Sequence, residues 1–190
     1  MKQARREAYE MGEEILPFDD VCIMFQDEAR FGRINSPHRC WVKGERPVVY
    51  CQIVREYTYA FVAVCPFDGD MISLIMPWAN TNTMNIHLAE ISKRNHDKNI
   101  LMFVDKAGWH IAKDLQIPKN IRLVPILPYS PELNPTEHIF DELREKYFHN
   151  LFFNKMSAVE DRLEVGLRDM ENNKQLVRST TAFNWVISCV

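Results

Sequence analysis

Two short, almost wholly apolar runs each lead into an aspartate, and this feature constrains the fold more than any other. The first run is Val21–Phe25, followed closely by Asp27, and the second is Ile100–Val104, followed directly by Asp105. Runs of this length without polar alternation are typical of strands buried on both faces of a sheet. Ligands of open α/β sheets bind beyond the carboxyl ends of such strands. If these two strands are parallel neighbours, both carboxylates project into one crevice.

The rest of the chain predicts the other layers of an α/β domain. Further strands are expected around residues 40–42 and over residues 57–65, 71–76 and 121–127, with a hairpin turn at 66–70. Helices are expected over residues 81–95 (capped by Thr81 or Asn82), 110–115, 135–149, 157–172 and 175–187. Antiparallel strands followed by alternating helix and strand give a mixed α/β sheet flanked by helices. We therefore expect a helical lead-in over residues 1–20 and one domain over residues 21–190.

Composition excludes several classes of protein. A hydrophobic fraction of 46% fills a core, so wholesale disorder is excluded, and the apolar runs are too short for a transmembrane helix. The charged first 14 residues do not resemble a signal peptide. The five cysteines include no C-x-x-C pair, which argues against structural zinc or a disulfide framework and favours a reducing cytoplasm.

Carboxylates predict a cation site. Two anions in one crevice repel each other, and a divalent cation is the simplest compensation. Oxygen ligands favour Mg²⁺, although either Asp27 or Asp105 could instead be an ordinary turn residue. Glu137 is the third candidate, and it has a competing interpretation. Asn134, Pro135 and Glu137 fit the N-cap, first and third positions of a capping box, which would occupy the glutamate at the helix start.

Three motifs carry a family resemblance. They are FQDEARFGR at residues 25–33, VDKAGWH at 104–110 and LPYSPELNPTEH at 127–138. Together they resemble the catalytic (DDE) domain of bacterial insertion-sequence transposases of the mariner-like superfamily, from Val21 to the C-terminus. The resemblance implies an RNase H-like fold with a mixed five-stranded sheet, and an acidic triad of Asp27, Asp105 and Glu137. It also implies two Mg²⁺ ions, for which Mn²⁺ would substitute, and metal-dependent DNA cleavage and strand transfer at transposon ends by a homodimer.

Four polar side chains near the triad are candidate supporting groups. His110 and His138 either orient the carboxylates or touch a phosphate, or else are structural residues of a helix start and an exposed helix face. Asn134 stands three residues before Glu137. Lys106 stands where relatives usually have Asn or Gly, and strand alternation would direct it away from Asp105, where it could contact a phosphate.

A basic segment predicts DNA contact. The segment spans residues 30–55 of a chain whose net charge is −3. It contains one acid and six basic residues, which are Arg30, Arg33, Arg39, Lys43, Arg46 and Arg55. Interspersed aromatic side chains, Trp41 among them, suit stacking on an unpaired base beside the phosphate backbone. A solvated loop with Trp41 packed on the core is the alternative, as is contact with a partner subunit.

Two other functions compete with transposition. One is an inactive transposase remnant that acts only as a DNA-binding or dimerisation module, and the other is a simple RNase H-like nuclease. Relatives carry a helix-turn-helix region before the catalytic domain, and fewer than 27 residues precede Asp27 here. The sequence therefore predicts that this region is lacking or encoded separately, with the protein in the bacterial cytoplasm, associated with the nucleoid.

Overall fold

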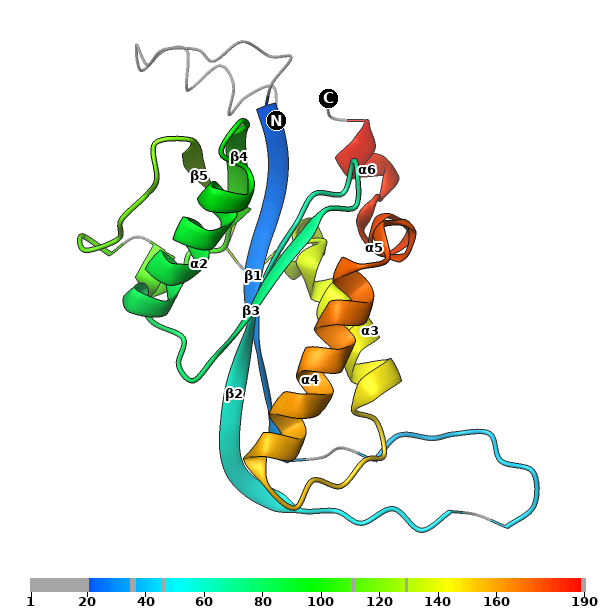
Figure 1. Ribbon diagram of the computed structural model, residues 1–190. Coiled ribbons are helices and arrows are strands. Elements are labelled where there is room, and N and C mark those ends of the chain that lie inside the picture. The colour runs from blue at the N-terminus through cyan, green and yellow to red at the C-terminus, as the bar shows by residue number, and fades with distance from the viewer. Residues whose placement is uncertain (1–20, 35–36, 46, 111, 129, 189–190) are drawn as a thin grey trace.

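A five-stranded sheet in the order β3-β2-β1-β4-β5 forms the centre of the protein (Figure 1). The computed structural model describes residues 21–34, 37–45, 47–110, 112–128 and 130–188. The strands are β1 (Val21–Ile34), β2 (Ile53–Val64), β3 (Met71–Met76), β4 (Asn99–Val104) and β5 (Ile121–Pro125). β2 is antiparallel to β1 and β3, whereas β4 is parallel to β1 and β5. The predicted mixed sheet is therefore confirmed.

The central strand, β1, is longer than its apolar run predicts. It pairs with β4 only as far as Phe25 opposite Phe103, while its pairing with β2 continues from Phe25 to Ile34. The two apolar strands are parallel neighbours, as expected. Asp27 does not end its strand, however, because β2 continues to supply hydrogen-bond partners. It lies two residues beyond the point where β4 stops pairing with β1.

Helices cover both faces of the sheet, so that β1 contributes to two apolar cores. Met24 packs in the core beneath α2 (Thr81–Arg94), whereas Ile23 and Phe25 face the opposite core, because neighbouring strand residues point to opposite faces. The helices of that opposite face are α3 (Thr136–Tyr147), α4 (Met156–Glu171), α5 (Lys174–Thr181) and α6 (Asn184–Ile187). In the described part of the chain, no helix is long and apolar enough to cross a membrane.

The hairpin predicted at residues 66–70 is confirmed. The backbone N–H of Cys65 donates to the carbonyl of Asp70 at 2.8 Å, and Gly69 has a φ of +79°, which favours glycine. The Gly69 α-carbon also lies against the carbonyl of Lys174, where a side chain has no room. This turn therefore fixes the β2–β3 hairpin against the start of α5.

Several local expectations are wrong. Residues 40–42 form no strand, because β1 and β2 pair directly with each other and leave this segment as an exposed loop. The N-cap of α2 is Asn80, whose side chain accepts the backbone N–H of Thr83 at 3.1 Å.

Two expected helices also differ. The described residues among 110–115 form no α-helix, and the 3-10 turn η2 (Gly108–His110) ends where that helix is expected to begin. The last helix is divided into α5 and α6 because Phe183 is extended, with φ −65° and ψ 149°. The lead-in predicted over residues 1–20 lies outside the described residues.

Candidate active site

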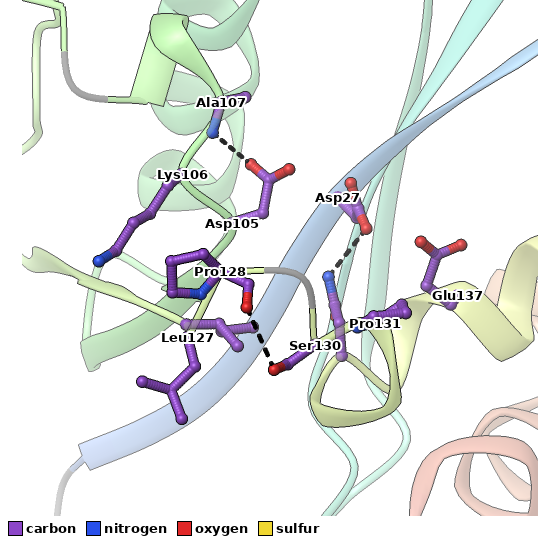
Figure 2. A pocket seen from close by; sticks show the side chains of 11 residues that line it. Asp27, Asp105, Lys106, Ala107, Leu127, Pro128, Ser130, Pro131 and Glu137 are labelled. Atoms are coloured by element: carbon purple, nitrogen blue, oxygen red, sulfur yellow. Dashed lines mark hydrogen bonds between the residues drawn. The ribbon is translucent and has the colours of Figure 1, made fainter.

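A cavity of about 430 Å³ lies where β1 and β4 diverge (Figure 2). Asp27 reaches it from β1, Asp105 from the loop directly after β4, and Glu137 from the first turn of α3. In Figure 2 the carboxylate of Asp27 is drawn between those of the other two acids. The remaining lining residues are Lys106, Ala107, Ile126, Leu127, Pro128, Ser130, Pro131 and Asn134. The structure thus brings together the three acids that the sequence singled out.

The surroundings of Asp27 disfavour the ionised form of its carboxyl group. Burial first, and then the charge of Glu28, raise the pKa of Asp27 to about 8, with smaller contributions from Glu137 and Asp105. Its Oδ1 accepts the backbone N–H of Glu28 at 2.8 Å, and its Oδ2 accepts the side-chain amide of Asn134 at 2.9 Å. These bonds fix its orientation without supplying a positive charge.

The environment of Asp105, unlike that of Asp27, favours the ionised carboxylate. Its side chain is about half exposed, and its Oδ1 accepts the backbone N–H of Ala107 at 2.9 Å. The Nδ1 of buried His110 lies 2.7 Å from the same Oδ1 and 3.1 Å from the main-chain carbonyl oxygen of Asp105. The bond from His110 holds the pKa of Asp105 below its ordinary value. Its Oδ2 has no hydrogen-bond partner among the residues that the structure describes. One oxygen is therefore held by the protein and the other remains for a ligand.

Asn134, not Glu137, makes the side-chain bond at the start of α3. The Oδ1 of Asn134 accepts the backbone N–H of Thr136 at 3.2 Å, while its Nδ2 donates to Asp27. Asn134 follows the 3-10 turn η3 (Pro131–Leu133), and α3 itself has no side-chain cap bond. Of the capping box that competes with the catalytic interpretation, the bond to Asn134 is present, but among the described residues the side chain of Glu137 makes no hydrogen bond and faces the cavity (Figure 2).

The structure separates the two histidines and directs Lys106 outward. His110 lies beside Asp105, whereas His138 is exposed on α3 and packs on the ring of Phe183, with centroids 4.8 Å apart. Lys106 is exposed, and Figure 2 shows its side chain directed away from Asp105. Of these three side chains, only His110 contacts a carboxylate of the triad.

Sequence reasoning missed one buried acid, Glu28, behind the cavity. Its Oε1 accepts the indole N–H of Trp109 at 2.7 Å, and its Oε2 accepts the amide of Gln26 at 3.1 Å. Its Oε2 also lies 3.5 Å from the Nε2 of His110, which is an ion-pair distance and not a hydrogen bond. Alternation along β1 predicts that Glu28 points away from Asp27, but nothing local predicts a contact with residues 81 and 82 positions further along.

The donor set fits a hard divalent cation. All three acids offer oxygen, which suits Mg²⁺ and Mn²⁺. Within the described ranges, no three His, Cys, Asp or Glu side chains already form a cluster that could hold an ion. Mg²⁺ does not require one, because it keeps several waters and uses only one or two carboxylates directly.

The family assignment follows from the sequence that carries this site. Residues 22–160 match the model of the DDE superfamily endonucleases, and this range includes all three acids. The chain belongs to this family. A curated relative, the uncharacterized protein y4pE/y4sA of Sinorhizobium fredii (strain NBRC 101917 / NGR234), is 39% identical over 98 residues, which are 51% of this chain and 73% of the relative.

Solved structures show the same fold as this DDE domain. The Mos1 strand transfer complex matches with a TM-score of 0.58 at 15% identity, over 95% of this chain and 59% of the Mos1 chain. The Mos1 mariner paired-end complex with Mn matches with a TM-score of 0.55 at 15% identity, over 96% of this chain and 71% of that chain. The predicted RNase H-like fold is confirmed. The chain spans about 60% of the length of the first of these transposase chains.

The basic residues of the DDE domain lie in different environments. Between β1 and β2, residues 37–45 and 47–52 form a projecting arm that carries exposed Arg39 and Lys43 (Figure 1). Arg30, at the surface of β1, lies over the ring of Tyr57, 4.6 Å from its centroid. Arg46 lies outside the described residues.

Arg33 has a structural environment at the base of this arm. Its Nε donates to the carbonyl of Phe153 at 3.0 Å, its Nη1 pairs with Glu56 at 2.8 Å, and its side chain is 17% exposed. Gln52 donates to the same carbonyl at 2.7 Å. The structure therefore keeps Arg39 and Lys43 available to a ligand and uses Arg33 to hold the arm.

The alternative of a packed Trp41 is wrong. The Trp41 side chain is fully exposed on the arm, together with Val48 and Tyr50, at 81% and 72%. These three side chains therefore lie outside the core.

Proposed function

We propose that this domain catalyses metal-dependent DNA cleavage and strand transfer at transposon ends. In this proposal Asp27, Asp105 and Glu137 hold two Mg²⁺ ions, for which Mn²⁺ substitutes. The observation that carries it is the convergence of three carboxylates on one cavity, with the pKa of Asp27 raised to about 8 where a cation would lower it.

The chemistry divides between the ions and the chain. When bound, divalent ions would activate a water or a 3′-hydroxyl and stabilise the leaving oxygen of an in-line phosphoryl displacement. The residues of the chain supply position. Asn134 holds one oxygen of Asp27, and His110 holds one oxygen of Asp105, so each carboxylate keeps lone pairs directed at the cavity.

The solved relatives support the choice of substrate and metal. The Mos1 structures include complexes with paired transposon ends, with Mn and with Mg. By analogy, the substrate proposed here is duplex DNA, met in the cytoplasm and nucleoid of a bacterium. Arg39 and Lys43 on the arm, and Lys106 beside the cavity, are the cations best placed to meet phosphates.

A homodimer is the proposed active form. The arm exposes Trp41, Val48 and Tyr50, which is apolar surface that a second subunit would cover. Two domains would also place two cavities on two transposon ends. An N-terminal DNA-binding half, encoded in the same chain or separately, would supply recognition of the end sequence.

The decisive experiment compares cleavage and joining. Wild type, Asp105→Asn and the control Asp114→Asn, an exposed aspartate away from the cavity, are incubated with an uncut transposon-end duplex and with a pre-cleaved one. We expect both reactions with Mg²⁺ or Mn²⁺ for wild type and control, and neither for Asp105→Asn. Cleavage without joining would indicate a simple nuclease, and DNA binding without either reaction an inactive remnant. Activity that persists in EDTA or in Asp105→Asn would refute the proposed site.

A further inference from the structure

Glu28 is a buried carboxylate on the face of β1 opposite Asp27. Its side chain is only 6% exposed, in a protein where buried acids need partners. Two neutral donors supply hydrogen bonds to it, the indole of Trp109 and the amide of Gln26. Neither supplies a positive charge. The ring of His110, wholly buried and 3.5 Å away, is the neighbouring group that can.

His110 joins Glu28 to the cavity. Its Nδ1 lies 2.7 Å from the Oδ1 of Asp105 and 3.1 Å from the main-chain carbonyl oxygen of the same residue. Its Nε2 faces Glu28, so the ring lies between two carboxylates. Burial alone would lower the pKa of His110, but the two carboxylates outweigh it and raise the pKa to about 10. The two ring nitrogens therefore face two carboxylates, one at the cavity and one behind it.

Trp109 and His110 also form the 3-10 turn η2, directly after the loop that carries Asp105. The carboxylate of Glu28 accepts a hydrogen bond from Trp109 and pairs with His110, so one side chain of β1 contacts two residues of the turn. Asp105 is half exposed and follows the end of β4. Two groups contact its Oδ1 among the described residues, the local backbone N–H of Ala107 and the ring of His110, and the second of these belongs to the turn.

We propose that Glu28 is a positioning residue that acts through His110 to aim the free oxygen of Asp105 into the metal cavity. This proposal rests on the proposed function for the identity of the ion. The series of contacts from Glu28 through His110 to Asp105, however, is present in the metal-free protein. Partners that orient a ligand in this way are typically worth 10–100-fold in metal affinity.

The test measures Mn²⁺ binding by electron paramagnetic resonance in wild type and Glu28→Gln. Gln keeps the size of the side chain and an acceptor for Trp109 but removes the charge. The matched control is Glu171→Gln, a carboxylate that bonds Ser73 at 2.6 and 2.7 Å far from the cavity. We expect the Mn²⁺ dissociation constant to rise about tenfold in Glu28→Gln and to stay within twofold in the control.

A double variant separates positioning from simple charge. If Glu28 acts through His110, then Glu28→Gln combined with His110→Gln binds Mn²⁺ no more weakly than His110→Gln alone. If Glu28 acts by its charge on neighbouring Asp27, the two losses multiply, and the proposal is overturned. An unchanged dissociation constant in Glu28→Gln overturns it as well.

A measurement without metal distinguishes failure of the role proposed for Glu28 from failure of the proposed metal site. In ¹H–¹⁵N spectra, the ring N–H protons of His110 should be protected from exchange in wild type and lose protection in Glu28→Gln. If wild type binds no Mn²⁺, or Asp105→Asn binds it equally well, the proposed metal site fails. Protection that is equal in both proteins overturns the role of Glu28 alone. Should Glu28→Gln not fold, Trp109→Phe, which removes the 2.7 Å bond, replaces it in every measurement.

Discussion

Raising the pH should destabilise the metal-free protein through Asp27, and Asp27→Asn should remove this dependence. The pKa of Asp27 is about 8 in the folded protein, above its ordinary value of 3.8, because of burial and then the charge of Glu28. Between these values the folded state keeps a proton that the unfolded state has lost. Stability therefore falls as the pH rises from about 4 to about 8.

The magnitude follows from the shift. Each pH unit in this window corresponds to about 1.36 kcal/mol, so the limit between pH 5 and pH 8 is about 4 kcal/mol. The side chain of Asp27 lines an open cavity, and water in that cavity stabilises the ionised carboxylate in part. We therefore expect stability to fall by about half of the limiting value, about 2 kcal/mol. The raised pKa of His110 also makes stability fall in the upper part of the range, but it is retained in both proteins and cancels in the comparison.

The assay is urea unfolding in EDTA at intervals from pH 5 to pH 8. The free energy of unfolding of wild type, relative to Asp27→Asn, should fall by about 2 kcal/mol across the range. The exposed control Asp161→Asn should follow wild type, and saturating Mn²⁺ should flatten the dependence by keeping Asp27 ionised. A wild-type-to-variant difference that stays constant with pH would refute the argument that the cavity disfavours an ionised Asp27.

Three further predictions concern the supporting residues. Glu137→Gln should change the free energy of unfolding by less than about 0.5 kcal/mol, because Glu137 makes no cap bond. The same variant should lower metal-dependent cleavage about a hundredfold or more, and an equal loss of stability and cleavage would restore the capping interpretation. Asn134→Ala should cost about 1–2 kcal/mol in urea unfolding, because it removes the amide that joins Asp27 to the start of α3; an unchanged midpoint would contradict this. Reversing the charges of Arg39 and Lys43 to Glu should reduce the slope of log affinity for duplex DNA against log salt by about 2 at an unchanged melting temperature; an unchanged slope would remove the arm from the DNA interface.

Local sequence patterns predicted the elements that build the site. The apolar runs before Asp27 and Asp105 gave two strands, because an unalternating run is stable only when both faces are covered, and α2 and α3–α5 cover them. Where a run had no such partner the pattern misled, as at residues 40–42. The capping motif at Asn134 also misled in part, because a motif predicts a local bond and cannot show that a distant carboxylate offers a better one.

The sequence by itself determined most of the strands and helices, and it singled out three acids that the structure places at one cavity, because these features depend on side-chain periodicity and on short motifs. Only the tertiary structure decided how those acids are supported. The contacts of Asn134 with Asp27, of Trp109 with Glu28 and of Arg33 with Phe153 join residues 107, 81 and 120 positions apart. Such contacts arise where β1 meets the segments that follow β4, precede α3 and follow α3, and no local pattern specifies them. The divergence of β1 from β4 after Phe25, where the cavity lies, is likewise a tertiary feature that no local pattern specifies.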